Sequence, residues 1–376
     1  MNGCRIAFYA PMKPVDHPTP SGDRQMARLI VQALRENGAA VDIPSKLRTW
    51  MRQGGRKAQQ DLARQSAEEV QRILAGWRAT GRTPDCWVTY HLYHRAPDWI
   101  GPAISDALNL PYVVIEASRS PRRRTGEWAV GFEAADAALA RADAVAYIHN
   151  EDRDGLAGTV APDRLTHFPP FIDKSRFPEK KTRDTNNPVQ LLTIAMMREG
   201  DKSRSYGVLA DALKALPNLP WHLTIAGDGP ARDNILRQFP ADRITYLGAI
   251  SPDDIADVYR QGDIFVWPAI NEAYGAVLLE AQASGLSVIA GNSGGVAEIV
   301  GHEETGLVVP EGDVKLFSQA IDLLAGDPRA INKMGAAAAA HVRLRHDLTQ
   351  ARHRLADILK MARRNRYAAT QNYGIS

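Results

Sequence analysis

The feature that most constrains this chain is an alternation of short, fully apolar runs with amphipathic segments along its second half. The apolar runs occupy residues 191–195, 223–226, 244–247, 264–267 and 288–290. Between them, apolar residues recur at helical spacing, as in residues 209–216. Strands buried on both faces read as continuous apolar runs, and helices supply the crossovers between parallel strands. The pattern predicts a doubly wound α/β domain with a parallel sheet.

The first half of the chain repeats this pattern less clearly. Candidate strands lie at 6–10, 88–90, 112–115 and 144–148, and candidate helices at 26–34 and 59–78. Residues 173–188 are polar and flanked by prolines, which is typical of linkers, so we expect domains at 1–185 and 186–347. A helical stretch follows from about 330 to 364, with a break expected near 345–347. The C-terminal segment after this break, 348–376, is expected to pack back on the first domain.

Composition excludes several classes of protein. The 376 residues are 44% apolar and carry a net charge of +3, unlike disordered chains or proteins that coat nucleic acid. No run approaches the roughly 18 apolar residues that a membrane span needs. Two distant cysteines, Cys4 and Cys86, show no metal-binding spacing and fit a reducing compartment. A cytoplasmic protein is therefore expected, and a peripheral position at the inner membrane face stays open.

The segment 271–285 carries the clearest chemistry. It follows the predicted strand 264–267, and a helix is expected to begin near Gly275. A helix amino terminus offers free N–H groups and positive dipole to an anion such as phosphate. The carboxylates of Glu272 and Glu280 can accept hydrogen bonds from sugar hydroxyls. A phosphate-binding site flanked by two carboxylates predicts a ligand that is both anionic and rich in hydroxyl groups.

This segment resembles the Glu-x7-Glu signature of retaining glycosyltransferases of the GT-B architecture, in particular glycosyltransferase family four. The similarity extends to a "GLPVVA"-like strand at 285–290, a "GGxxE"-like loop at 294–298, a "tGxLv"-like strand at 305–310 and a "GxGP"-like turn at 226–230. The resemblance implies an α/β protein with two Rossmann-like doubly wound domains that face each other across a cleft. It covers about residues 191–324 well and is diffuse before them.

The resemblance implies roles for residues of the second domain. Glu280 would hold the ribose of a nucleotide-sugar donor, and Glu272 would hold the donor sugar. The donor diphosphate would meet the backbone of Tyr274, Gly275, Ala276 and Val277, with Gly227 in the "GxGP"-like turn. Arg198 would neutralise the diphosphate together with a second cation, for which Lys202 is favoured and Arg204 stays open. Fixed cations there would stabilise the negative charge of the departing nucleoside diphosphate.

In the first domain, the resemblance suggests Gly22 near the donor phosphate and His91 beside the donor sugar. A helix cap at Ser21 and a structural histidine remain alternatives. Positive charge gathers in residues 46–57, which include Trp50, and in residues 118–124. These segments would meet an anionic acceptor or a membrane surface, or they are solvated loops.

We therefore expect a retaining glycosyltransferase that needs no metal or other cofactor. It would move a hexosyl group from a UDP-sugar or GDP-sugar to a hydroxyl acceptor: a glycan, a lipid-linked glycan or a small molecule. A nucleotide-sugar epimerase, a phosphorylase and a non-catalytic sugar-nucleotide-binding protein remain alternatives. A dinucleotide oxidoreductase is disfavoured, because neither half has GxGxxG with an acidic residue about 20 positions later.

Overall fold

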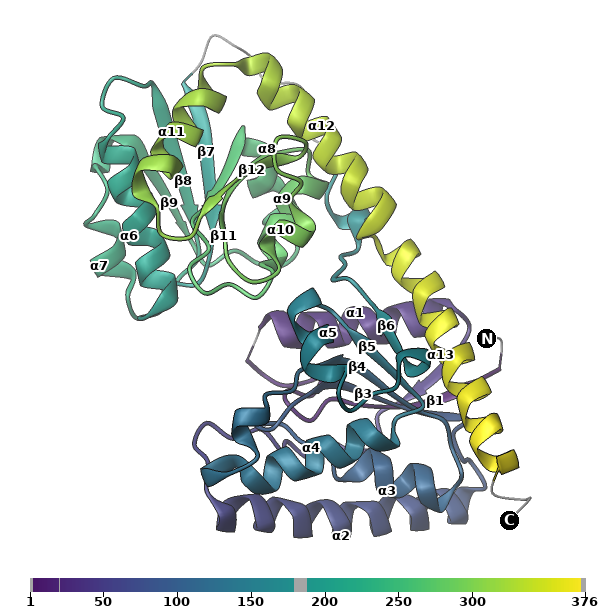
Figure 1. The fold of residues 1–376 in the computed structure, drawn as a ribbon. Helices are drawn as coiled ribbons and strands as arrows, with labels where there is room; N and C mark the ends of the chain where they lie inside the picture. Colours follow the sequence, from purple (N-terminus) through teal and green to yellow (C-terminus); the bar gives the residue numbers. More distant parts are fainter. Residues whose placement is uncertain (1–2, 20, 179–187, 373–376) are drawn as a thin grey trace. The chain divides into compact units, whose positions relative to one another are not determined.

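A computed structural model describes residues 3–19, 21–178 and 188–372, and Figure 1 shows the arrangement of helices and strands within each part. The chain divides into two compact units: unit 1 is Met1–Pro170 with Leu348–Ser376, and unit 2 is Phe171–Asp347. The boundary expected after residue 185 lies outside the described residues. The chain already joins unit 2 at Phe171, since the Ile172 N–H donates to the His346 carbonyl over 2.9 Å.

Unit 1 contains a six-stranded parallel sheet in the order β2-β1-β3-β4-β5-β6. Its strands are β1 (Arg5–Tyr9), β2 (Ala40–Asp42), β3 (Cys86–Leu92), β4 (Tyr112–Ala117), β5 (Ala144–Tyr147) and β6 (Leu165–His167). The predicted strands are confirmed. The sequence missed β2 and β6, because these three-residue edge strands are partly exposed and lack an apolar run.

Two layers of helices cover this sheet. In Figure 1, α2, α3 and α4 lie on one face and α1, α5 and α13 on the other. Their bounds are α1 (Gly22–Glu36), α2 (Arg56–Thr80), α3 (Ile100–Ala107), α4 (Ala129–Arg141), α5 (Asn150–Leu156) and α13 (Leu348–Asn372), with short 3-10 turns η1 (Pro121–Arg123), η2 (Gly126–Trp128) and η3 (Pro162–Arg164). The predicted long helix at 59–78 is α2, which buries Val70, Ile73 and Leu74.

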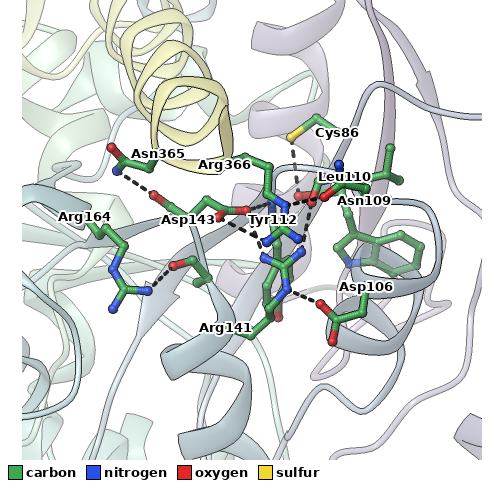
Figure 2. A network of polar contacts seen from close by, with 12 residues as sticks. Cys86, Asp106, Asn109, Leu110, Tyr112, Arg141, Asp143, Arg164, Asn365 and Arg366 are labelled. Atoms are coloured by element: carbon green, nitrogen blue, oxygen red, sulfur yellow. Dashed lines mark hydrogen bonds and ion pairs between the residues drawn. The ribbon is translucent and has the colours of Figure 1, made fainter. Parts of the chain in front are cut away.

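The last helix, α13, is fixed to unit 1 by polar contacts around the buried Asp143 (Figure 2). Asn365 on α13 donates to the Asp143 carbonyl over 2.9 Å, and the neighbouring Arg366 donates to the Asn109 side chain over 2.9 Å. The Asp143 carboxylate accepts the Tyr112 N–H over 2.8 Å. Residues that are more than 200 positions apart in the chain therefore share one network.

Unit 2 contains a second six-stranded parallel sheet, in the order β12-β11-β10-β7-β8-β9. Its strands are β7 (Val189–Ile194), β8 (Trp221–Ala226), β9 (Ile244–Gly248), β10 (Ile264–Trp267), β11 (Ser287–Asn292) and β12 (Gly306–Pro310). The doubly wound α/β fold predicted from the apolar runs is confirmed. The apolar runs of the sequence form the strands at the core of this unit, and β10 is buried along its whole length.

The helices of unit 2 also lie on both faces of their sheet (Figure 1). They are α6 (Asp201–Lys214), α7 (Arg232–Leu236), α8 (Ile255–Gln261), α9 (Ala276–Ala283), α10 (Val296–Ile299), α11 (Val314–Ala325) and α12 (Pro328–Arg345), with 3-10 turns η4 (Lys174–Arg176) and η5 (Ala241–Arg243). The predicted helix break near residue 346 is confirmed between α12 and α13. Among the described residues, no helix combines the length and hydropathy that a membrane crossing requires.

Candidate functional site

The strand order of unit 2 marks where a ligand is expected. Strands β7 and β10 are hydrogen-bonded neighbours although two other strands separate them in the chain. In open parallel sheets, ligands bind outside the carboxyl ends of the strands that flank such a reversal of winding. The loop after β7, residues 195–200, and the loop after β10, residues 268–275, therefore define the candidate site.

Glu272 lies at the centre of the polar contacts at this edge. Its Oε2 accepts a hydrogen bond from Nζ of Lys202, in the first turn of α6, and one of 3.2 Å from Nε1 of Trp267. The Lys202 ammonium lies 5.2 Å from the centroid of the Trp267 ring. The Lys202 and Glu272 side chains are only 26% and 16% exposed, so this ion pair is screened less than a surface pair. The structure thus brings two of the predicted site residues into contact.

The loop that carries Glu272 has an unusual backbone that α6 holds in place. Ala269 and Asn271 have φ angles of 55° and 48°, in the left-handed region that non-glycine residues rarely adopt. The Ile270 N–H donates to Oγ of Ser205 over 3.0 Å, and the Asn271 amide donates to the Asp201 carboxylate over 2.7 Å. Such strain persists only where surrounding contacts determine it. The loop is therefore shaped before any ligand binds.

Helix α9 begins immediately after this loop, as the sequence predicts. Gly275 precedes its first residue, Ala276, with a left-handed φ of 68°, and Tyr274 is buried. The first N–H groups of a helix, here those of Ala276 and Val277, have no carbonyl acceptor within the helix. The amino terminus of α9 and the Glu272 carboxylate thus belong to one short turn of chain, which offers N–H donors and an acceptor to the same ligand.

The loop after β11 supports the Glu272 turn from behind. Oγ of Ser293 accepts the Glu272 N–H over 3.1 Å, and the Gly295 N–H donates to the Ala273 carbonyl over 2.5 Å. A Cβ on Gly294, whose φ is 50°, would lie 2.3 Å from the Glu272 carbonyl oxygen. The "GGxxE"-like stretch of the sequence therefore allows two backbones to approach closely.

Gly227 has a comparable role between the loops after β7 and β8. Its φ is 130°, and a Cβ at this position would lie 1.9 Å from the Ala195 carbonyl oxygen. The Met197 N–H donates to the Asp228 carbonyl over 3.0 Å in the same region. Gly227 thus positions the 195–200 loop through its backbone.

The two arginines predicted for the diphosphate do not join the Glu272 contacts. Arg198 is exposed on the loop after β7, and its carbonyl accepts from both the N–H and Oγ of Ser203. Arg204 is exposed and pairs with Asp201 three residues earlier on α6. Of the three cationic candidates, Lys202 is the one that contacts Glu272.

Glu280 lies inside α9, half-buried, where Tyr259 donates to its Oε2 over 2.8 Å. Burial raises the pKa of Glu280 to about 7, although the Tyr259 hydrogen bond and the Arg176 charge both act to lower it. Tyr259 itself is fully buried on α8. Near neutral pH, Glu280 therefore exchanges between an acid that can donate a hydrogen bond and a carboxylate that can only accept.

In unit 1, His91 is the centre of a second cluster at the carboxyl ends of β3 and β4. Its Nδ1 lies 3.2 Å from Oδ1 of Asp23 and 3.4 Å from Oε1 of Glu116. His91 and Glu116 have left-handed φ angles of 65° and 59°. Burial would lower the pKa of His91, but the two carboxylates outweigh it and raise the pKa to about 9. His91 is therefore a cation at neutral pH.

Gly22 opens helix α1 at this edge, without a special backbone requirement. A Cβ on Gly22 would meet open space, and its φ is ordinary. Ser21 caps the helix, because its Oγ accepts the Arg24 N–H over 3.3 Å. The neighbouring Asp23 faces His91. Ser21 thus caps the helix, as the alternative interpretation of this loop predicts. The side chain of this loop that contacts His91 is Asp23.

Sequence reasoning missed five residues that shape these clusters. They are Trp267, Ser293 and Tyr259 in unit 2 and Asp23 and Glu116 in unit 1. Trp267 is the last residue of β10 and Glu116 is the penultimate residue of β4. A position at the carboxyl end of a buried strand is a usable signal for a site residue. Tyr259 and Ser293 act on Glu280 and Glu272 from other elements, and nothing in the sequence links them.

The carboxylates of Glu272 and Glu280 both accept hydrogen bonds from protein side chains. Lys202 binds Glu272 and Tyr259 binds Glu280. Within the parts of the chain that the structure describes, no three His, Cys, Asp or Glu side chains lie close enough to hold a metal ion. Independence from a metal ion stays a prediction, which a chelator tests.

Comparison with known sequences identifies relatives of this chain. Residues 178–341 match the family described as glycosyl transferases group 1. The chain is 30% identical over 169 residues to a sulfoquinovosyl transferase of Arabidopsis thaliana. This alignment covers 42% of this chain and 32% of the relative. It is 31% identical over 223 residues to a GDP-mannose-dependent alpha-(1-6)-phosphatidylinositol monomannoside mannosyltransferase of Mycobacterium tuberculosis, covering 52% of this chain and 56% of the relative. The matches thus span between a third and just over half of these relatives.

Solved structures resemble the whole chain. Sucrose-phosphate synthase from Thermosynechococcus elongatus superposes with a TM-score of 0.74 at 18% identity and covers 97% of this chain and 100% of its own. The Anabaena protein HepE, solved in complex with UDP, has a TM-score of 0.71 at 15% identity and covers 95% of this chain and 99% of its own. Residues 178–341 thus match the glycosyl transferases group 1 family, and the two-unit α/β fold of the chain resembles these solved structures.

Proposed function

We propose that this protein is a retaining glycosyltransferase that needs no metal ion and moves a hexosyl group from a nucleoside diphosphate sugar to a hydroxyl acceptor. The observation that carries the proposal is the contact of Lys202 with Glu272 beside the amino terminus of α9. There, a shielded cation, a carboxylate and helix N–H groups share the edge where ligands of such sheets bind. An anionic, hydroxyl-rich ligand satisfies all three.

The donor fits this edge group by group. The diphosphate takes the N–H groups of Ala276 and Val277 and the charges of Lys202 and Arg198. Glu272 accepts from the sugar hydroxyls, and Glu280 accepts from the ribose. UDP or GDP is the proposed nucleotide, since one structural neighbour was solved with UDP and one relative is named as GDP-mannose-dependent.

In the proposed reaction, the bond between the anomeric carbon and the diphosphate oxygen breaks while the acceptor oxygen bonds to the same face of that carbon. The acceptor proton passes to an oxygen of the departing phosphate, so no protein nucleophile is needed. Negative charge grows on the diphosphate as the bond stretches, and Lys202, fixed by Glu272 and Trp267, stabilises it without reorganisation. A fixed lysine supplies the charge that a divalent ion supplies in other enzymes.

His91 is assigned to the sugar being transferred. As a cation held by Asp23 and Glu116, it donates hydrogen bonds and cannot act as a base at neutral pH. The cytoplasm is the proposed location, because Cys4 and Cys86 are free, buried thiols. Separation of soluble and membrane fractions tests this location and any peripheral attachment.

The first experiment is thermal unfolding with UDP, GDP, ADP and their sugar conjugates, with EDTA present. A ligand at about 100 times its Kd stabilises the folded state by about 2.7 kcal/mol. We expect one nucleotide series to stabilise the wild type and to lose this effect in Glu280→Gln. The matched control is Asp322→Asn, an exposed carboxylate on α11, which should behave as wild type.

Turnover then separates the enzyme classes. Release of nucleoside diphosphate that increases with a hydroxyl acceptor, in EDTA, is the expected result. Interconversion of the nucleotide sugar would identify an epimerase, and phosphate-dependent turnover a phosphorylase. Donor binding without any turnover would identify a binding protein. Absence of binding by every nucleotide would overturn the proposal.

A further inference from the structure

Unit 1 carries an arginine-rich surface that the proposed donor site does not use. In its sheet the winding reverses between β1 and β3, so a ligand is expected at the carboxyl ends of these two strands. Three loops approach one another there. The Met51 N–H donates to the Arg95 carbonyl over 3.0 Å, and the Gly55 N–H donates to the Glu127 carbonyl over 2.9 Å. The loops after β2, β3 and β4 are therefore joined at this edge.

Aromatic rings form a continuous floor across the three loops. Nε1 of Trp50 donates to the Tyr93 hydroxyl over 2.9 Å. The rings of Tyr93 and His94 lie 5.3 Å apart, and those of His94 and Trp128 lie 5.4 Å apart. Trp128 is buried, whereas Trp50, Tyr93 and His94 are partly exposed. We call the floor and the arginines on it the arginine shelf: Arg48, Trp50, Tyr93, His94, Arg95, Arg123 and Trp128.

Two arginines stack on this floor. The Arg48 guanidinium lies 4.5 Å from the Trp50 ring centroid, and the Arg95 guanidinium lies 5.1 Å from that of Trp128. A stacked guanidinium is held by its flat face, while its N–H groups point outward in its plane and fit the oxygens of a phosphate in pairs. Stacking therefore fixes these side chains in advance of binding, which reduces the entropy that binding costs.

A third arginine adds to the positive charge at the same place. Burial, and then the charges of Arg123 and Arg95, lower the pKa of His94 to about 4, so both arginines act on this ring. Nε2 of His94 is buried without a hydrogen-bond partner among the described residues. His94 is therefore neutral at neutral pH, and the positive charge at this place comes from the arginines.

Within the part of the chain that the structure describes, the shelf arginines lack acidic partners. In the described ranges, no ion pair joins Arg48, Arg95 or Arg123 to a carboxylate, although the nearby Arg119 pairs with Asp136. Arg48 donates instead to the Met12 carbonyl over 2.9 Å. Unpaired arginines collected on one ligand edge raise the local concentration of anions.

We infer that the arginine shelf binds the phosphate of a phosphorylated acceptor, either a free sugar phosphate or the headgroup of a phosphorylated lipid. This inference rests on the proposed function and names the acceptor class. The shelf continues into the His91 cluster, since the rings of His91 and Tyr93 lie 5.3 Å apart. A phosphate on the shelf would therefore place the attached hydroxyl groups toward His91, where the proposed reaction needs its acceptor.

The test is binding of phosphate-bearing probes to the whole protein. Calorimetry uses inorganic phosphate, glucose 6-phosphate and inositol 1-phosphate, each compared with the sugar or inositol alone. Cosedimentation uses phosphatidylcholine vesicles with and without phosphatidylinositol. We expect at least one phosphate-bearing probe to bind and Arg95→Ala with Arg123→Ala to weaken it roughly tenfold or more. Soluble probes and vesicles distinguish the free from the lipid-borne phosphate.

The matched control is Arg78→Ala with Arg82→Ala. This variant also removes two positive charges. The two arginines are exposed and lie near the carboxyl end of α2, before the start of β3, at the opposite edge of the sheet. This control variant should bind the phosphate probe as tightly as the wild type. If both double variants lost the same affinity, the effect would be due to net charge alone and the inference would be overturned. The single variant Arg123→Ala, at an exposed residue, keeps the test valid if the double variant unfolds.

Two further results separate this inference from the proposed function. Binding of the phosphate probe should persist in Lys202→Ala, because the donor edge belongs to unit 2. If donor nucleotides stabilise the protein but no phosphate probe distinguishes the shelf variant from wild type, the inference fails and the transferase proposal stands. If no donor binds, the transferase proposal itself fails.

Discussion

The two units have sheets of the same kind, yet their ligand edges are built differently. In unit 2 the edge is formed mostly by backbone. Residues with left-handed φ angles, glycines that let two backbone segments approach closely and the start of α9 surround one ion pair. In unit 1 it is formed by side chains from several loops, with His91 between two carboxylates and arginines stacked on aromatic rings. The same fold therefore supports one ligand edge built mainly from backbone and one built mainly from side chains.

The proposed function accounts for this difference through what each edge would recognise. A backbone N–H binds phosphate whatever side chains surround it, so the diphosphate common to all donors can be met by a fixed turn. Acceptors differ in charge and shape, and side chains on loops can change without disturbing the sheet. Variants that damage one edge and leave the other intact test this division directly.

The largest expected effect is on catalysis at unit 2. Replacing Lys202 by alanine removes the shielded cation beside Glu272 and should lower kcat by about 100- to 1000-fold, as for loss of one preorganised electrostatic group. The control is Arg204→Ala, which breaks only an exposed pair with Asp201 and should change kcat by less than about threefold. Steady-state kinetics with the preferred donor measures both. If both variants lost the same fraction of kcat, Arg204 would also be assigned to binding of the donor diphosphate.

The next effect concerns the backbone at the same edge. Gly227→Ala would place a Cβ 1.9 Å from the Ala195 carbonyl oxygen at a φ of 130°, so we expect a loss of about 3 kcal/mol in the free energy of unfolding. The control is Gly76→Ala on α2 of unit 1, where a Cβ meets open space. It should stabilise by about 0.5 to 1 kcal/mol. Denaturant unfolding measures both, and a tolerated alanine at 227 would contradict this account of the loop.

The contrast also explains what the sequence could predict. The strands of unit 2, the start of α9 and the Glu272 turn are local in the chain, so apolar runs and a glycine identify them. The Lys202 contact joins residues 70 positions apart, and only the strand order brings them together. The His91 cluster draws on α1, β3 and β4, whose register no sequence pattern specifies.

A third prediction concerns the charge of His91 in unit 1. Its pKa in the folded protein is about 9, above its ordinary value near 6.5. The resulting stabilisation is complete below pH 6.5 and is lost as the pH rises through 9, and it amounts to at most about 3.5 kcal/mol. The difference in unfolding free energy between wild type and His91→Gln should therefore shrink between pH 6 and pH 9.5.

Glu116→Gln sharpens this prediction, because it leaves Asp23 as the remaining carboxylate beside the ring. The pH dependence should become smaller and shift to lower pH. If the difference between wild type and His91→Gln stayed constant with pH, the carboxylates would not hold His91 as a cation, and its proposed role as a hydrogen-bond donor would fall.

The smallest expected effect is on donor affinity and belongs to unit 2. Because burial raises the pKa of Glu280 to about 7, a rise from pH 6 to pH 8 converts it mostly from acid to carboxylate. If the ribose hydroxyls require an acceptor, the Kd of the nucleoside diphosphate should fall by roughly tenfold over this range. Glu280→Gln should bind weakly with little pH dependence, and Tyr259→Phe, which removes the hydrogen bond that lowers this pKa, should move the transition to higher pH. A wild-type Kd independent of pH would mean that Glu280 donates to the ribose as an acid, or does not contact it.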